Sequence, residues 1–326
     1  MKVFMSACKQ AVQPLVNFQG GFNLEPFFRR KDKVVFVMGA TGTGKSRLAI
    51  DLATRFPAEI INSDKIQVHK GLDIVTNKVT EEECHGVPHH LLGIIEPNAN
   101  FTSADFRNQA SLAIESILSR DRLPIIAGGS NSYIEALVND DADFQLRYEC
   151  CFLWVDVSLP VLHSFVSKRV DRMVELGLVE EVRRMFDPQA DYTSGIRRAI
   201  GVPELDQFLR AESILDDKTR VKFLEAAIEK VKENTCKLAC RQLQKIQRLY
   251  NQWKWSMHHI DATEVFLKRG EEAEQAWDKL VTRPSTSMVR QFLYDEDCVA
   301  TILPPETTII ATPPVSIAAA VAAATR

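Results

Sequence analysis

The chain has 326 residues, of which 45% are hydrophobic and 25% charged, and its formal net charge is −3. This balance is typical of one large globular domain or two smaller ones, and no stretch approaches the roughly 18 uncharged apolar residues that a membrane span needs. The net charge excludes a general attraction to nucleic acid or anionic lipid, so any such affinity needs a local basic patch. Seven cysteines without a Cys-x-x-Cys pair favour reduced thiols over a disulfide scaffold.

Residues 1–32 are predicted to form a leader, because they are basic, poor in acids and without a long apolar run. Organelle transit peptides share this composition. The segment has a single serine, Ser6, so a disordered leader stays open as the alternative. In both interpretations the folded core begins near residue 33.

A phosphate-binding motif opens the core. Residues 34–38 (VVFVM) predict a buried strand, residues 39–46 (GATGTGKS) match G-x-x-x-x-G-K-[ST], and residues 47–56 predict a helix. In this phosphate loop, the glycines let backbone N–H groups converge on a phosphate, and the helix N-terminus adds partial positive charge. Lys45 supplies a charge for the distal phosphate, and the Ser46 hydroxyl is placed to bind Mg²⁺. The candidate phosphate ligands are therefore Gly39, Ala40, Thr41, Gly42, Thr43, Gly44, Lys45 and Ser46.

The phosphate-loop motif alone does not show which phosphate-bearing ligand it binds. Hydrolysis or transfer of a nucleoside triphosphate needs a second carboxylate, usually at the end of another apolar strand. Residues 124–129 (PIIAGG) end in glycines, whereas residues 152–156 (FLWVD) end in Asp156, which could simply begin the next turn. An ordinary NTPase interpretation is therefore incomplete.

The second strand, residues 59–64 (EIINSD), ends in an acid. Because ligands of a parallel sheet lie beyond the carboxyl ends of its strands, Asp64 is expected near the phosphate loop, where it could bind a metal or act as a general base. A helix cap or turn former is the alternative role for Asp64.

Six segments then point to one enzyme family. They are residues 39–46, 61–78 (INSDKIQVHKGLDIVTNK), 126–133 (IAGGSNSY), 168–182 (KRVDRMVELGLVEEV), 195–204 (GIRRAIGVPE) and 237–242 (KLACRQ). On these segments, the chain closely resembles the isopentenyltransferase family, which prenylates N6 of adenine. The resemblance runs in order over about two thirds of the chain.

Two branches of this family share these segments: transfer RNA dimethylallyltransferases, and plant adenylate isopentenyltransferases that make cytokinin from free nucleotides. The eukaryotic RNA enzymes carry a C-terminal Cys₂His₂ zinc module, whereas here Cys298 stands alone after residue 240 and no Cys pair precedes His258 and His259 at finger spacing. The resemblance favours the adenylate branch. The alternatives are a tRNA dimethylallyltransferase, a small-molecule kinase of the same loop type and a non-catalytic nucleotide-binding regulator.

The resemblance implies the first step of cytokinin biosynthesis. A dimethylallyl group would pass from dimethylallyl diphosphate to N6 of free AMP, ADP or ATP, with Mg²⁺ as cofactor. Lys45 and the loop would stabilise the leaving diphosphate, Asp64 would accept the N6 proton, and Ser130, at the usual threonine position of its segment, would hydrogen-bond near the reacting centre. Nucleic acid is not expected as a partner, and neither is a membrane. A monomer is expected, located in the plastid, with the cytoplasm as the alternative.

Further basic residues are candidates for phosphate contacts. Lys237, Arg241, Lys245 and Arg248 fall on one face of a helix, and most of that face is expected to be solvated. Arg241 matches the Arg-Gln pair of the family, so the resemblance implies a contact with the diphosphate. Arg197 and Arg198 are candidates for the acceptor's phosphates, and the sequence leaves open which of them points inward. For His85, His89 and His90, polar packing is favoured over a metal site.

The predicted fold class is α/β, a parallel sheet of the P-loop NTPase type flanked by helices and carrying a small helical insertion. The expected divisions are a core over residues 33–157, an insertion over 158–212, helices returning to the core over 213–265, and a C-terminal extension over 266–326 with a disordered Ala/Pro-rich tail. The insertion would open with one amphipathic helix over 158–188 and would exclude water from the active site. Thr102 and Asp105 predict a capping box for a helix over 103–120.

Overall fold

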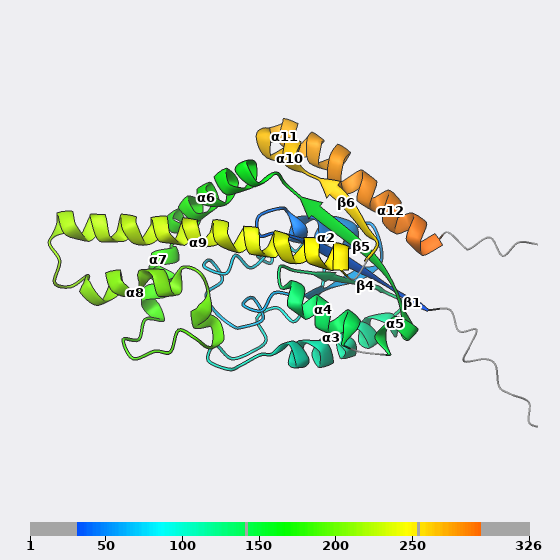
Figure 1. Cartoon of the computed structure of the whole chain (residues 1–326), viewed down its shortest axis with the longest axis horizontal. Helices are drawn as coiled ribbons and strands as arrows, with labels where there is room; N and C mark the ends of the chain where they lie inside the picture. The colour runs from blue at the N-terminus through cyan, green and yellow to red at the C-terminus, as the bar shows by residue number, and fades with distance from the viewer. Residues whose placement is uncertain (1–30, 141–142, 253–254, 295–326) are drawn as a thin grey trace, which may run out of the picture.

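The computed structural model describes residues 31–140, 143–252 and 255–294. A six-stranded sheet, in which every pairing is parallel, is flanked by helices on both faces (Figure 1). The predicted fold class is thus confirmed. The leader, apart from its last two residues, and the Ala/Pro-rich tail lie outside the described residues.

The strands are ordered β3-β2-β4-β1-β5-β6 across the sheet. Their bounds are β1 (Asp32–Gly39), β2 (Ala58–Asn62), β3 (His89–His90), β4 (Leu123–Ala127), β5 (Tyr148–Asp156) and β6 (Met257–Asp261). The helices are α2 (Lys45–Ala53), α3 (Ser103–Leu118), α4 (Asn131–Asn139), α5 (Phe144–Arg147), α6 (Leu159–Glu175), α7 (Leu178–Arg184), α8 (Val202–Ala211), α9 (Asp217–Gln252), α10 (Thr263–Leu267), α11 (Gly270–Trp277) and α12 (Arg283–Tyr294). A 3₁₀ turn, η1 (Gly195–Arg198), and a π-helical turn, η2 (Asp278–Thr282), complete the described elements.

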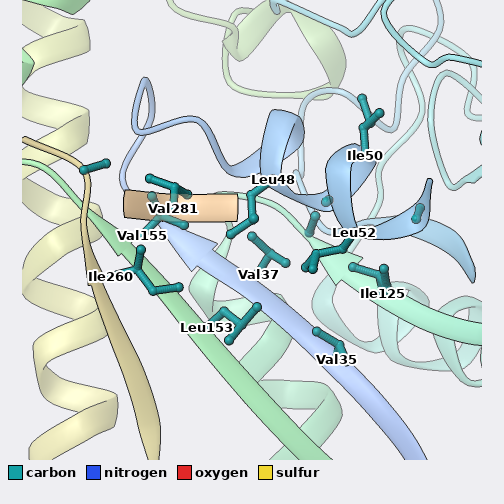
Figure 2. Close-up of a cluster of buried hydrophobic side chains, with 14 of the residues drawn as sticks. Val35, Val37, Leu48, Ile50, Leu52, Ile125, Leu153, Val155, Ile260 and Val281 are labelled. Atoms are coloured by element: carbon teal, nitrogen blue, oxygen red, sulfur yellow. The ribbon is translucent and has the colours of Figure 1, made fainter. Parts of the chain in front are cut away.

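The central strand β1 is buried on both faces, which explains its unbroken apolar sequence. Val35 and Val37 point into a cluster that α2, η2 and α12 cover, as Figure 2 shows for part of it. Phe36 points to the other side, into a cluster that α3 and α4 cover. Because alternate residues face opposite layers, neither face of β1 can carry polar side chains without a cost.

The order of the strands brings three loops together. Strand β4 lies between β2 and β1, with Ile125 in register with both Ile60 and Val35. Because all three strands are parallel, their carboxyl ends meet at one edge of the sheet. The phosphate loop, the segment after β2 and the segment after β4 therefore lie side by side.

The helix expected over residues 158–188 is not continuous, and that prediction is wrong. It is broken into α6 and α7 at Gly177, whose φ of 103° is left-handed. A helix cannot pass through this conformation, and glycine adopts it without a steric cost.

The capping box of α3 is confirmed: Thr102 N donates to Asp105 Oδ2 at 2.9 Å, and Asp105 N donates to Thr102 Oγ1 at 3.2 Å.

Helix α9 is 36 residues long and runs along much of the length of the described fold (Figure 1). One end packs with α7, η1 and α8 in a third apolar cluster, and the other end contributes Ile246 and Leu249 to the cluster beside the sheet. The C-terminal α11, η2 and α12 also pack on the sheet, where Trp277 and Val281 are buried. Within the described ranges, no helix is both long enough and apolar enough to cross a bilayer.

Candidate active site

The phosphate loop turns sharply between β1 and α2. Gly42 and Gly44 have φ values of 88° and 92°, which other residues rarely adopt. Space is also restricted: a Cβ on Gly42 would lie 2.6 Å from a methyl of Val166, and one on Gly44 would lie 2.5 Å from the Trp277 ring. The sequence therefore needs glycine at both positions for two reasons, conformation and close packing.

Lys45 is buried at the base of this loop, with 9% of its surface exposed. Its Nζ donates to the carbonyl oxygen of Ala40 at 2.7 Å. The pKa of Lys45 is lowered from 10.5 to about 8, chiefly by burial; the carboxylate of Asp64 opposes this shift, and the nearby Arg169 adds to it. An anion bound beside this buried amine would stabilise its charged form, so the site favours binding of an anion.

Arg169, on α6, is a second cation at the loop, and the sequence analysis missed it. Its Nη2 donates to Thr41 Oγ1 at 2.9 Å, while its Nε is buried with no hydrogen-bond partner in the described chain. Burial lowers its pKa to about 10. A signal was present in the sequence, because Arg169 interrupts the apolar face that Val166, Val170 and Met173 form on α6.

Asp64 lies two residues after the end of β2 and acts as a turn former, the alternative role considered for it. Its Oδ1 accepts hydrogen bonds from the backbone N–H groups of Ile66, at 2.9 Å, and Gln67, at 3.3 Å, so it shapes the turn. It also lines the large cavity beside the phosphate loop. The turn holds the carboxylate in a fixed position at the edge of the sheet.

Ser130 links the second and third of these loops. Its Oγ accepts the backbone N–H of Lys65 at 2.9 Å, and it lines the same cavity as Asp64.

The pKa of the Lys65 side chain is lowered, first by burial and then by the nearby cations Arg198 and Lys245. The basic side chains here are therefore close enough to repel one another, which favours binding of an anion.

Gln242, on α9, joins the loops after β1 and β4, a role that sequence reasoning did not assign. Its Oε1 accepts the backbone N–H of Thr41 at 2.8 Å, and its Nε2 donates to the Gly129 carbonyl at 2.9 Å. Its side chain is 8% exposed. The Arg-Gln pair was noted in the sequence, but only its arginine received a role there.

These groups surround one cavity of about 1050 Å³. Helices α6, α9 and α11 form its walls above the edge of the sheet. Among the described residues that line it, the acids are Asp64 and Glu83, against a larger set of bases: Lys45, Arg47, Lys65, Lys168, Arg169, Arg198, Arg241, Lys245, Lys268 and Arg269. A cavity of this size and charge suits a ligand that carries several phosphate groups.

Most of the predicted site residues meet in this cavity. Its lining includes Thr41, Gly42, Gly44, Lys45, Ser46, Asp64, Ser130, Arg198 and Arg241. Gly39, Ala40 and Thr43 are not part of the lining, and the Thr43 hydroxyl instead donates to the Ala40 carbonyl at 3.0 Å. These three residues therefore belong to the side of the loop that faces away from the cavity lining, and they shape its backbone.

Arg197 is a correction to the predicted phosphate ligands. Its Nη1 donates to the Met185 carbonyl at 2.7 Å and its Nε to Asn98 at 3.5 Å, outside the cavity lining. In the tight 3₁₀ turn η1, adjacent side chains point in different directions, so only Arg198 reaches the cavity.

The basic face of α9 divides into cations that line the cavity and cations that pair with acids outside it. Arg241 and Lys245 line the cavity. Lys237 instead pairs with Glu233 at 3.4 Å, and Arg248 pairs with Glu135. Of these four cations, the two in the middle of the row therefore face the cavity, and the two at its ends do not.

Three other candidate residues, Asp156, His89 and His90, contact other groups of the protein. Asp156 Oδ2 lies 3.1 Å from His259 Nε2 and is not part of the cavity lining. His89 Nδ1 contacts the Val87 carbonyl at 2.8 Å, and His90 Nε2 contacts Glu59 at 2.6 Å. Over the residues that the structure describes, no group of three or more His, Cys, Asp or Glu is placed to hold a metal ion.

The donor set of the cavity nevertheless fits Mg²⁺. The Ser46 hydroxyl and the Asp64 carboxylate line it together, and both present oxygen. Mg²⁺ typically takes one or two protein oxygens and completes its shell with substrate phosphates and water. The surplus of cations would hold those phosphates.

Comparison with known proteins identifies the family. A model of the family described as IPP transferase matches residues 67–147 and 139–248. Adenylate isopentenyltransferase 5, chloroplastic, of Arabidopsis thaliana is 68% identical over 334 residues and covers 100% of both chains. Adenylate isopentenyltransferase 7, mitochondrial, of the same plant is 60% identical, covering 90% of both. The Arabidopsis tRNA dimethylallyltransferase 2 is 33% identical, covering 82% of both.

Solved structures agree on the fold. A eukaryotic dimethylallyltransferase acting on tRNA superposes with a TM-score of 0.68 at 24% identity, covering 81% of this chain and 80% of that one. The tRNA isopentenylpyrophosphate transferase of Bacillus halodurans gives a TM-score of 0.64 at 24% identity, covering 81% of this chain and 99% of that one. The chain therefore belongs to the IPP transferase family of prenyltransferases, and it is far more similar to the adenylate isopentenyltransferases than to tRNA dimethylallyltransferase 2.

Proposed function

We propose that this protein transfers a dimethylallyl group from dimethylallyl diphosphate to N6 of adenine in free AMP, ADP or ATP, the first step of cytokinin biosynthesis. The observation that carries the proposal is one cavity in which the phosphate loop, Asp64 and a surplus of cations face one another. The identity of 68% to an adenylate isopentenyltransferase supports the same acceptor class.

The donor diphosphate is assigned to the phosphate loop. The C–O bond to the allylic carbon breaks as charge grows on the diphosphate, so the main task is electrostatic. The loop N–H groups, Lys45 and Arg169 would stabilise that charge, and Arg241 would hold the diphosphate from α9. Mg²⁺, when bound by Ser46 and the phosphates, would supply further neutralisation of the leaving group.

The acceptor amine is assigned to Asp64. The lone pair of N6 is delocalised into the purine ring, which makes the amine a weak nucleophile. A carboxylate that accepts its proton as the N–C bond forms raises that nucleophilicity and orients the amine. Ser130, fixed beside Asp64 by the Lys65 N–H, would hold the adenine, and Arg198 would contact the acceptor's phosphates.

The test is an incubation of the full chain with Mg²⁺, dimethylallyl diphosphate and, separately, AMP, ADP, ATP and unmodified transfer RNA, read by mass spectrometry. A prenyl mass gain on a free nucleotide is expected, and it should vanish in Asp64→Asn. Gain on RNA alone would move the protein to the second candidate function, which the 33% identity to a tRNA dimethylallyltransferase keeps in the comparison. Conversion of ATP to ADP without prenyl transfer would instead indicate a kinase.

The plastid is the proposed location. Two Arabidopsis relatives, 68% and 56% identical, are named chloroplastic, and a third, 60% identical, is named mitochondrial. A fluorescent protein fused to the C-terminus of the full chain tests this, because the N-terminal leader stays free. Signal confined to mitochondria or the cytoplasm would contradict the proposal.

A further inference from the structure

A second cavity, of about 710 Å³, lies between α6 and α9. Its wall holds two cysteines one helical turn apart, Cys236 and Cys240, together with His163. Cys240 Sγ lies 3.4 Å from His163 Nε2, and Cys236 Sγ lies 4.0 Å from both the His163 carbonyl and Ser167 Oγ. The proposed transfer reaction uses none of these groups.

The contact between Cys240 and His163 suits a reactive thiol. A thiol attacks as its thiolate, so an adjacent base that accepts the proton speeds the attack. His163 Nε2 is within reach and serves as that acceptor in the tautomer protonated on Nδ1. The thiol also faces a cavity, so a reagent can approach it.

Other described cysteines lack this environment. Burial raises the pKa of Cys150 and of Cys151 to about 12, and burial also raises the pKa of Cys84. Thiols with raised pKa values react slowly at neutral pH. Within the described part of the chain, these three cysteines serve as internal controls for the pair in the cavity.

Two other uses of the pair are less suited to the geometry. A metal site is not favoured, because no group of three or more ligating side chains in the described residues is placed to hold an ion. A direct Cys236–Cys240 disulfide would strain α9, because helix positions four apart hold their Cβ atoms about 5–6 Å apart, whereas a disulfide needs about 3.5–4.5 Å. An adduct with an external sulfur avoids that strain.

We propose that Cys240 is a thiol-modification site that takes a small disulfide such as oxidised glutathione, with His163 as the proton acceptor. The Cys240 sulfur attacks one sulfur of the reagent, and its proton passes to His163. A new S–S bond forms as the S–S bond of the reagent breaks, and the other half leaves as a thiolate. The adduct occupies the cavity between α6 and α9.

The adduct would also reach the large cavity beside the phosphate loop. Arg241, the next residue, lines both cavities, and its Nε donates to the Lys237 carbonyl at 3.3 Å. Gln242, one residue further, holds the phosphate loop. A group attached to Cys240 therefore displaces Arg241 and slows prenyl transfer. This consequence rests on the proposed function, whereas the modification itself does not.

The modification is tested by incubating the full chain with oxidised glutathione and mapping tryptic peptides without reductant. Cleavage after Lys232, Lys237 and Arg241 places Cys236 and Cys240 on separate peptides. The peptide of Cys240 is expected to gain one glutathionyl group well before the single peptide that carries both Cys150 and Cys151, and dithiothreitol should remove it. Equal rates at Cys240 and at the peptide of Cys150 and Cys151 would overturn the proposal, and this comparison needs no variant.

Three variants sharpen the assignment. His163→Gln should slow modification of Cys240 by about tenfold or more, because the general base is lost; an unchanged rate would overturn the role of His163. In the prenyl-transfer assay, oxidised glutathione should inhibit the unmodified protein and Cys236→Ser but not Cys240→Ser. Modified Cys240 with unchanged transfer would overturn the coupling through Arg241. Absence of transfer in untreated protein would overturn the proposed function, and the peptide map would stay readable.

Discussion

The backbone N–H of Thr41, in the phosphate loop, donates to Gln242 Oε1 on α9 at 2.8 Å, although the two residues are 201 positions apart. The same side chain donates to the Gly129 carbonyl at 2.9 Å. One buried amide thus fixes two loops of the candidate active site relative to the long helix. This arrangement couples the geometry of the phosphate loop to the position of α9.

Replacing Gln242 by Ala is therefore expected to damage the site without removing a reacting group. The substitution leaves the Thr41 N–H and the Gly129 carbonyl unpaired, which costs about 1–3 kcal/mol of stability. Prenyl transfer should fall about 10- to 100-fold in kcat/KM, with KM for dimethylallyl diphosphate rising, because misplaced loop donors bind it less well. Steady-state kinetics and urea unfolding measure both effects. The matched control is Gln247→Ala, an exposed glutamine of the same helix; equal losses in the two variants would contradict this role.

Asp64→Asn separates the proposed base from the phosphate site. The amide keeps the shape of the side chain but cannot accept the N6 proton, so kcat is expected to fall about 100-fold or more. Affinity for dimethylallyl diphosphate, measured by calorimetry, should change little. Asp156→Asn is the control, because Asp156 also ends a strand of the same sheet, β5, but lies outside the cavity lining. Loss of activity in Asp156→Asn alone would reverse the assignment of the carboxylate.

The lowered pKa of Lys45 predicts that diphosphate binding weakens as the pH rises through about 8. A phosphate beside Lys45 favours the charged amine, so binding takes up a proton above that pH. Calorimetry with inorganic diphosphate and Mg²⁺, in buffers of different ionisation enthalpy, measures this uptake. Lys45→Met should abolish it, whereas Lys168→Met, at an exposed lysine of the same cavity, should preserve it. Identical proton uptake in both variants would assign the titration to another group.

The same pKa shift makes Lys45 unfavourable for folding. Its folded-state pKa of about 8 lies below the ordinary value of 10.5, so the unfolded chain binds more protons between these two values. The free energy of unfolding therefore rises with pH across this window, and the penalty is fully present below pH 8. Lys45→Met is expected to raise the free energy of unfolding at neutral pH by about 1–3 kcal/mol while abolishing transfer. Urea unfolding at neutral pH tests it; a destabilised variant would show that packing, not desolvation, dominates.

Replacing Arg197 and replacing Arg198 are expected to have opposite effects, one on stability and the other on substrate binding. Arg198→Ala should raise KM for ATP about tenfold with little change in stability, because Arg198 faces the cavity. Arg197→Ala should leave KM nearly unchanged and lower the free energy of unfolding by about 1 kcal/mol, since it loses its bond to the Met185 carbonyl. Kinetics and thermal unfolding of both variants decide between them. A reversed pattern would show that Arg197 is the phosphate ligand.

Local sequence determined the parts of this protein that depend on neighbouring residues. The phosphate loop needs glycines at fixed spacing before Lys45, and the strand before it needs an apolar run, so both were predictable. The capping box at Thr102 and the placement of Asp64 at the end of a strand follow from the same local rules. Gly177 also carried a local signal, but glycine is tolerated inside helices often enough that the break between α6 and α7 was missed.

The tertiary structure alone decided which distant side chains meet at the loop. Arg169, Gln242 and Trp277 come from three helices, and no spacing in the sequence shows that each contacts the phosphate loop. The direction of Arg198 rather than Arg197 depends on how the short 3₁₀ turn η1 packs against the rest of the chain, where Arg197 donates to the Met185 carbonyl. The sequence by itself thus determined the chemistry at the edge of the sheet, because that chemistry follows from local backbone geometry. The folded structure decided the walls of the cavity, because packing between remote helices sets their positions.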